Sequence, residues 1–100
     1  AEMAFAGGFG LELDLVNAPR DKEVSADEIL LFAESNSRFI VEVMPEMRKA
    51  FEDSMVRVCT GRIGVVTADA HFVVRGVEGV PIVHTTIERL KESWQSTFRW

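Results

Sequence analysis

The stretch RIGVVTADAHFVVR, residues 62–75, gives the clearest signal for the fold of this chain. Segments 62–67 and 71–75 are short, apolar and rich in valine, as is typical of strands. The residues between them, 68–70, are few enough for a hairpin connection. We therefore predict an antiparallel pair of strands in the second half of the chain.

The residues that follow this pair predict a third strand and a closing helix. Residues 76–79 begin and end with glycine and form a turn, and residues 80–84 are again short and apolar. Thr85 or Thr86 can cap a helix, because a threonine hydroxyl accepts a hydrogen bond from a free amide of the first turn. The helix has one apolar stripe, made of Ile87, Leu90 and Trp94.

The start of the chain predicts the end of a helix and then a strand. Residues 1–8 have the composition of the tail of a truncated helix, which their two glycines stop. In residues 11–15, leucines alternate with acidic residues. One face of this strand is therefore predicted to be buried and the other, which bears Glu12 and Asp14, to be solvated.

The middle of the chain predicts two further helices with a strand between them. Ser25 followed by Glu28 is a capping box, in which the hydroxyl and the carboxylate each satisfy a free amide. The helix that it opens should end near Glu34. Residues 39–43 alternate as a strand does, and because apolar residues occupy both of its faces, we expect both faces to be covered. Pro45 suits the first position of the next helix, whose apolar face consists of Met47, Ala50, Phe51 and Met55.

This order of elements predicts the fold class. Helices and strands follow one another as helix tail, strand, helix, strand, helix, three strands and helix. We expect an α+β fold, with helices layered on a mixed or antiparallel sheet, in a single domain over residues 1–100. With 47% hydrophobic residues, a chain of this length buries a core of useful size.

Composition and charge exclude several classes of function. The net charge of -5 argues against a surface for nucleic acid or anionic membranes, which needs clustered Lys and Arg. The single cysteine, Cys59, excludes an internal disulfide framework and suits the reducing cytoplasm. No apolar stretch approaches the roughly 20 residues of a membrane span. The two histidines, His71 and His84, lack the spacing of a zinc site, so no metal site is expected.

A polar joint, ESNSR at residues 34–38, separates the first complete helix from the predicted strand 39–43. Its polar side chains can contact a ligand, or they can satisfy backbone groups where the helix ends. The residues alone leave both interpretations open. Arg38 can bind a phosphate with both arms of its guanidinium, although a surface ion pair with Glu34 or Glu42 is the commoner role for such an arginine.

Four segments together resemble one enzyme family. They are residues 1–4, the joint with its flanks at 31–43, segment 62–67, and the ending IERLKESW at 87–94. Their order and spacing resemble the C-terminal end of the synthase subunit of phosphoribosylformylglycinamidine synthase, over nearly the whole chain. The resemblance implies a C-terminal domain of the aminoimidazole ribonucleotide synthase superfamily, which is partly ferredoxin-like.

The resemblance also implies a chemistry. The family carries out ATP-dependent amidation of formylglycinamide ribonucleotide to the amidine in purine biosynthesis, with ATP and Mg as cofactors of the parent enzyme. Glu34, Ser35 and Asn36 match its substrate-contacting motif, with Asn36 in place of a glutamine. The family's catalytic histidines and metal-binding carboxylates lie in upstream domains. No catalytic or metal residue is therefore assigned here, and the isolated chain is expected to be inactive and to bind no cofactor tightly.

The expected partners follow from the same resemblance. They are the rest of the synthase chain and a separate glutaminase subunit, as in the small form of the enzyme. A dimer of this chain through exposed sheet surface is a further expectation. Two alternatives remain open: a stand-alone ferredoxin-like interaction or regulatory module, and another ATP-using enzyme of the same superfamily.

Overall fold

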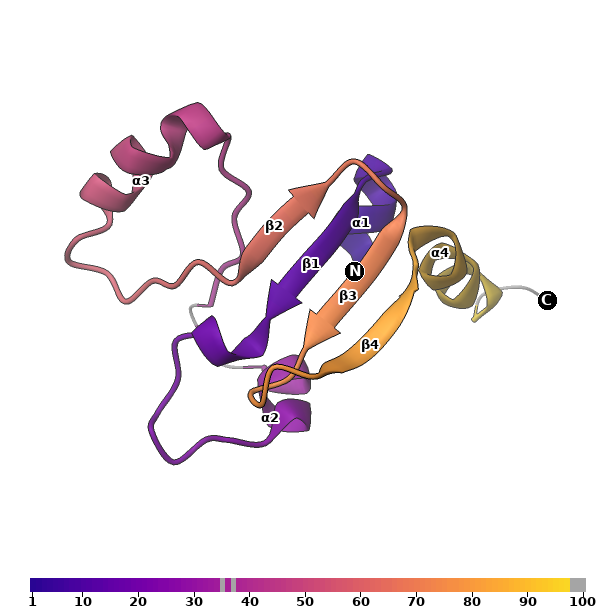
Figure 1. Cartoon of the computed structure of the whole chain (residues 1–100), viewed down its shortest axis with the longest axis horizontal. Coiled ribbons are helices and arrows are strands. Elements are labelled where there is room, and N and C mark those ends of the chain that lie inside the picture. The colour runs from indigo at the N-terminus through magenta and orange to yellow at the C-terminus, as the bar shows by residue number, and fades with distance from the viewer. Residues whose placement is uncertain (35, 37, 98–100) are drawn as a thin grey trace.

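A computed structural model describes residues 1–34, 36 and 38–97 of the chain (Figure 1). Within these residues, four strands form one mixed sheet in the order β2-β1-β3-β4. β1 (Gly10–Asp14) pairs antiparallel with β2 (Gly64–Thr67) and parallel with β3 (His71–Arg75). β4 (Pro81–Thr86) pairs antiparallel with β3 at the other edge. This arrangement confirms the predicted α+β class.

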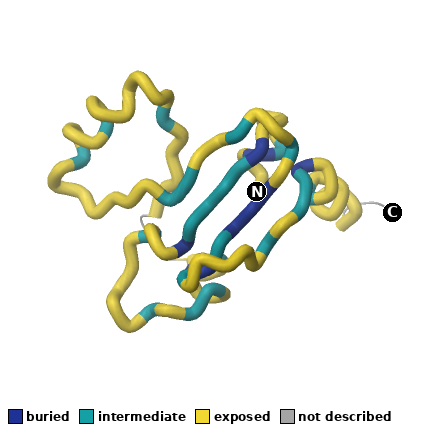
Figure 2. Tube along the Cα trace, in the orientation of Figure 1, coloured by how far each residue is buried: buried dark blue, intermediate teal, exposed yellow. Residues whose placement is uncertain are grey.

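Three helices supply the core on one face of this sheet. They are α1 (Glu2–Gly7), α2 (Asp27–Phe32) and α4 (Ile87–Ser96). The short 3₁₀ helix η1 (Leu15–Asn17) continues from β1. Buried residues gather along β3, where Val74 is completely buried (Figure 2). The core cluster consists of Ala4, Leu15, Leu30, Phe72, Val74 and Ile87.

The local signals at the two ends of the chain are confirmed. Gly8 ends α1 in the left-handed conformation, at φ 78°, and its amide donates to the carbonyl of Ala4 at 2.9 Å. Thr86 caps α4, because its hydroxyl accepts a hydrogen bond from the amide of Arg89 at 3.3 Å. The predicted hairpin of residues 62–67 with 71–75 is wrong. Both segments form strands, but β1 lies between β2 and β3 in the sheet, so they pair with β1 and not with each other.

The predicted strand at residues 39–43 is wrong. The chain there is not part of the sheet, and no backbone hydrogen bond joins it to another strand in the described structure. Phe39, Ile40 and Val41 are 86%, 71% and 58% exposed, so neither face is covered. Alternation reports only a local preference, whereas a strand also needs a neighbour that offers amides and carbonyls.

The predicted capping box at Ser25 is also wrong. Ala26 is the residue before α2, and no side chain caps the helix. The Asp27 carboxylate instead accepts a hydrogen bond from the amide of Val77 at 2.8 Å, which fastens the start of α2 to the β3–β4 turn. This contact joins residues far apart in sequence, so no local motif could announce it.

The helix predicted from Pro45 is present but does not pack as expected. Pro45 opens the 3₁₀ helix η2 (Pro45–Met47), and α3 (Arg48–Ser54) follows it. Neither element buries a residue, and Met47 is exposed. α3 lies to the side of β2 rather than over the sheet (Figure 1). Trp94, expected in the core, is half-exposed, with its ring centroid 5.8 Å from that of Phe5.

Candidate functional site

The polar joint at the end of α2 is the first candidate site. Glu34 and Asn36 are both exposed, and Asn36 lies in a turn. Ser35, the third residue of the predicted motif, lies outside the described residues. The structure therefore places two of the three residues at the surface, where a ligand can reach them.

Arg38 behaves differently from the prediction. Its Nη1 donates a hydrogen bond to the carbonyl of Ala33 at 3.2 Å, just after the end of α2. Among the described residues it makes no ion pair with Glu34 or Glu42. A guanidinium at the C-terminal end of a helix satisfies a free carbonyl and complements the helix dipole. The backbone-capping interpretation of the joint is thus supported for Arg38.

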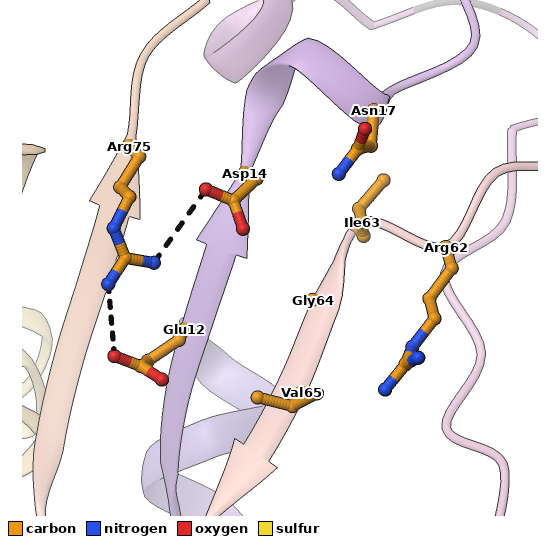
Figure 3. A pocket seen from close by; sticks show the side chains of 8 residues that line it. All are labelled: Glu12, Asp14, Asn17, Arg62, Ile63, Gly64, Val65 and Arg75. Carbon is orange, nitrogen blue, oxygen red and sulfur yellow. Dashed lines mark hydrogen bonds and ion pairs between the residues drawn. The ribbon is translucent and has the colours of Figure 1, made fainter. Parts of the chain in front are cut away.

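A second candidate is a hollow of about 250 Å³ on the sheet face opposite the core (Figure 3). The alternation of β1 directs Glu12 and Asp14 to this face, as predicted. The parallel register with β3 sets Arg75 directly opposite Asp14. The hollow is lined by Glu12, Asp14, Asn17, Arg62, Ile63, Gly64, Val65 and Arg75.

The charges in the hollow are largely paired. Nη2 of Arg75 lies 3.2 Å from Oε1 of Glu12, and its Nη1 lies 3.7 Å from Oδ1 of Asp14 (Figure 3). Side chains exposed to this degree form ion pairs that add little stability. The lining carries two carboxylates, Glu12 and Asp14, and two guanidinium groups, Arg62 and Arg75, so its formal charges balance. The hollow therefore has no net charge that would favour an anion or a cation.

The connection between β2 and β3, which passes the end of β1, forms a third polar cluster. Oδ1 of Asp69 accepts hydrogen bonds from the amide of His71 at 3.1 Å and from the hydroxyl of Thr67 at 2.9 Å. These bonds, first that from His71 and then that from Thr67, lower the pKa of the Asp69 carboxyl below its usual range. The rings of His71 and His84 meet edge to face, with centroids 5.7 Å apart. No group of three or more His, Cys, Asp or Glu side chains in the described part could hold a metal ion.

Sequence reasoning found the acidic side chains of the hollow but missed its arginines. The alternation over residues 11–15 was a sufficient signal for Glu12 and Asp14. Arg75 ends a predicted strand, but only the parallel pairing of β1 with β3 brings it to these carboxylates. That pairing is not encoded in any local pattern.

Comparison with known proteins identifies relatives of the chain. The family model described as "AIR synthase related protein, C-terminal domain" matches residues 1–77. Subunit PurL of phosphoribosylformylglycinamidine synthase from Moorella thermoacetica is 31% identical over 98 residues, which cover 97% of this chain and 12% of the relative. The PurL subunit of Corynebacterium aurimucosum is 37% identical over 78 residues, or 75% of this chain and 10% of the relative.

A third PurL subunit, from Caldanaerobacter subterraneus subsp. tengcongensis, is 32% identical over 104 residues, covering 99% of this chain and 13% of the relative. The chain thus spans about an eighth of the length of these curated relatives. No solved structure matches it. Among the described helices, none has the length and apolar character to cross a membrane.

Proposed function

We propose a function on one premise: this chain belongs to the family of AIR synthase related protein C-terminal domains. It is, in our proposal, part of a phosphoribosylformylglycinamidine synthase of the PurL type. The parent protein performs ATP-dependent amidation of formylglycinamide ribonucleotide in the cytoplasm. The supporting observation is the family match over residues 1–77, together with PurL relatives that cover up to 99% of the chain.

The proposed ligand role falls on the polar joint. In the intact enzyme, Glu34, Ser35 and Asn36 contact the ribonucleotide substrate or a bound nucleotide. Glu34 and Asn36 are exposed, and their side chains form no hydrogen bond or ion pair with another described residue. Their polar atoms are therefore available to a ligand without the loss of an existing contact.

The described side chains do not by themselves offer a site for Mg-ATP. The described residues include no cluster of three carboxylates, histidines or cysteines for a metal. The acidic pair Glu12 and Asp14 is already engaged with Arg75. We propose that ATP and magnesium are held elsewhere in the parent enzyme, with a separate glutaminase subunit as its partner. The isolated chain is inactive and serves as a scaffold.

The ligand role is tested in the parent synthase by Glu34→Ala and Asn36→Ala. Each substitution should weaken the equilibrium binding of the ribonucleotide or the nucleotide by about tenfold, because a hydrogen bond to a charged or polar ligand group is lost. Glu46→Ala removes an exposed carboxylate from η2 and is the matched control. Unchanged affinity in both joint variants would remove the ligand role and leave the family assignment standing.

The inactivity of the chain is tested separately. The isolated chain is incubated with ATP, magnesium, formylglycinamide ribonucleotide and ammonia, and formation of the amidine is followed. We expect no product above the level without protein. Turnover by the isolated chain would show that it supplies catalytic groups that we assign to the rest of the parent enzyme.

A further inference from the structure

The outer edge of β2 is a row of backbone groups that the described sheet leaves unpaired. The amide of Asp14 donates to the carbonyl of Ile63 at 2.7 Å, so Ile63 directs its backbone groups toward β1. Directions alternate along an antiparallel strand, so Val65 also faces β1. Gly64 and Val66 must then direct their amides and carbonyls outward. In the described sheet, β2 is an edge strand with β1 as its neighbour.

The outer edge of β2 lacks the features that usually prevent another strand from pairing with an edge. Natural edge strands are blunted by a charge, a proline or a bulge within the strand. β2 contains none of these: its sequence is GVVT, its register with β1 is regular, and Val65 and Val66 are 40% and 45% exposed. Segment 39–43 of the same chain makes no backbone hydrogen bond to it in the described structure.

We propose that β2 pairs antiparallel with β2 of a second copy, around a twofold axis that passes beside Val65. A strand that pairs antiparallel with itself forms an isologous contact, in which both copies use the same surface. With the axis at Val65, Gly64 lies opposite Val66 of the second copy. Both are outward-facing residues, so they form about four backbone hydrogen bonds in all.

The side chains of the edge suit this pairing. Gly64 has no side chain, which leaves room beside the exposed Val66 of the second copy. Arg62, before the strand, comes beside residues 68–69 of the second copy, next to the carboxylate of Asp69. Arg62 forms no hydrogen bond or ion pair with another described residue, and Asp69 uses only Oδ1 in its own turn. Two ion pairs, one at each end, therefore complete the contact.

The contact is small, because each strand contributes only the residues Gly64–Thr67. Small interfaces are typical of weak and transient association. The dimer should therefore form and dissociate with concentration. Its charged ends should make it weaker at about 0.5 M salt, where the Debye length falls to a few ångströms. The inference does not depend on the proposed ligand role of the joint.

Amide exchange across a wide dilution series is the direct test. We expect the amides of Gly64 and Val66 to become protected as concentration rises, while Val65, already bonded to β1, stays unchanged. Sedimentation equilibrium on the same samples should give 11.2 kDa when dilute and approach twice that mass when concentrated. Protection of Gly64 and Val66 at every dilution would mean that the chain's own segment fills the edge, and would overturn the proposal.

Two variants separate this contact from other ways of forming a dimer. Val66→Pro removes the backbone amide that points away from β1. Each copy then loses one hydrogen bond across the interface, two in all, so the dissociation constant of the dimer should rise by about tenfold or more. Val66→Thr keeps the amide and the branched shape and is its control. Circular dichroism checks that the proline variant is folded.

Arg62→Ala is a surface change that leaves the backbone intact, and it should weaken the dimer and reduce its salt dependence. Arg57→Ala removes another exposed arginine and is the control. A monomer at all concentrations would contradict the proposal. So would a dimer whose Gly64 and Val66 amides exchange as fast as in the monomer.

Discussion

At the scale of single residues, Gly64 shows how closely β1 and β2 approach. A Cβ added there would overlap the carbonyl oxygen of Glu12 and lie 2.8 Å from Cδ2 of Leu13. The obstacle is backbone, which cannot move aside as a flexible side chain can. Gly64→Ala should therefore lower the free energy of unfolding by about 2 kcal/mol, the cost of overpacking a tight site.

Urea unfolding measures this loss, and Gly7→Ala is the control. A Cβ at Gly7, the last residue of α1, would meet only the ring of Phe9 at 4.0 Å. Alanine favours the helix over glycine, so this variant should be neutral or slightly stabilising. Equal losses in the two variants would show that the strands are not as close as described.

Asp69 makes stability depend on pH in the acid range. Its two hydrogen bonds lower the pKa of the carboxyl in the folded state from 3.8. A lowered folded pKa gives stability that is present above the unfolded pKa and is lost as pH falls through the folded one. The melting temperature should thus fall below about pH 4, and less steeply in Asp69→Asn. Asp53→Asn is a matched exposed control; an equally steep fall in Asp69→Asn would contradict the assignment.

At the scale of elements, α2 depends on a contact with the β3–β4 turn. Asp27→Ala removes the acceptor for the Val77 amide, which should cost about 1 to 2 kcal/mol of unfolding free energy. Asp27→Asn keeps an acceptor oxygen and should lose less. Glu28→Ala, an exposed neighbour in the same turn, is the control for charge at a helix start. A loss in Glu28→Ala as large as in Asp27→Ala would mean that helix charge, not this bond, is responsible.

Elements defined by local chemistry were predictable from the sequence, and those defined by distant partners were not. The Gly8 and Thr86 caps and the alternation in β1 each rest on a few neighbouring residues, and the structure has all three. The predicted hairpin of 62–67 with 71–75 failed, because β1, from the start of the chain, lies between these two strands. The Arg75 ion pairs and the Asp27 contact link segments far apart in the chain. For the same reason, the alternation at 39–43 could predict a strand but not whether a neighbour exists for it.

At the scale of the whole molecule, α1, α2 and α4 contribute to a core on one face of the sheet, and none of them contributes to a core on the other face in the described structure. The core cluster gathers residues of α1, α2, α4 and the sheet on a single face. Glu12, Asp14 and Arg75 lie on the opposite face, outside this cluster. In the synthase proposed above, this second face would be available to other parts of the protein.

The exposed segment 39–43 allows a direct test of the packing seen in the structure. Phe39 is 86% exposed and Phe72 is 7% exposed. In the dilute isolated chain, Phe39→Ala should change the unfolding free energy by less than about 0.5 kcal/mol, since a surface side chain loses no packing. Phe72→Ala should cost about 3 kcal/mol or more, because it leaves a cavity in the core.

The same two substitutions in a full-length PurL parent distinguish two explanations for the exposure of segment 39–43. If another part of the parent covers the segment, Phe39→Ala becomes destabilising there while remaining neutral in the isolated chain. If it is neutral in both, the segment is a solvated connection between α2 and α3. A loss above about 1.5 kcal/mol in the isolated chain would mean that Phe39 packs within the domain after all, and that the strand predicted from its sequence forms in solution.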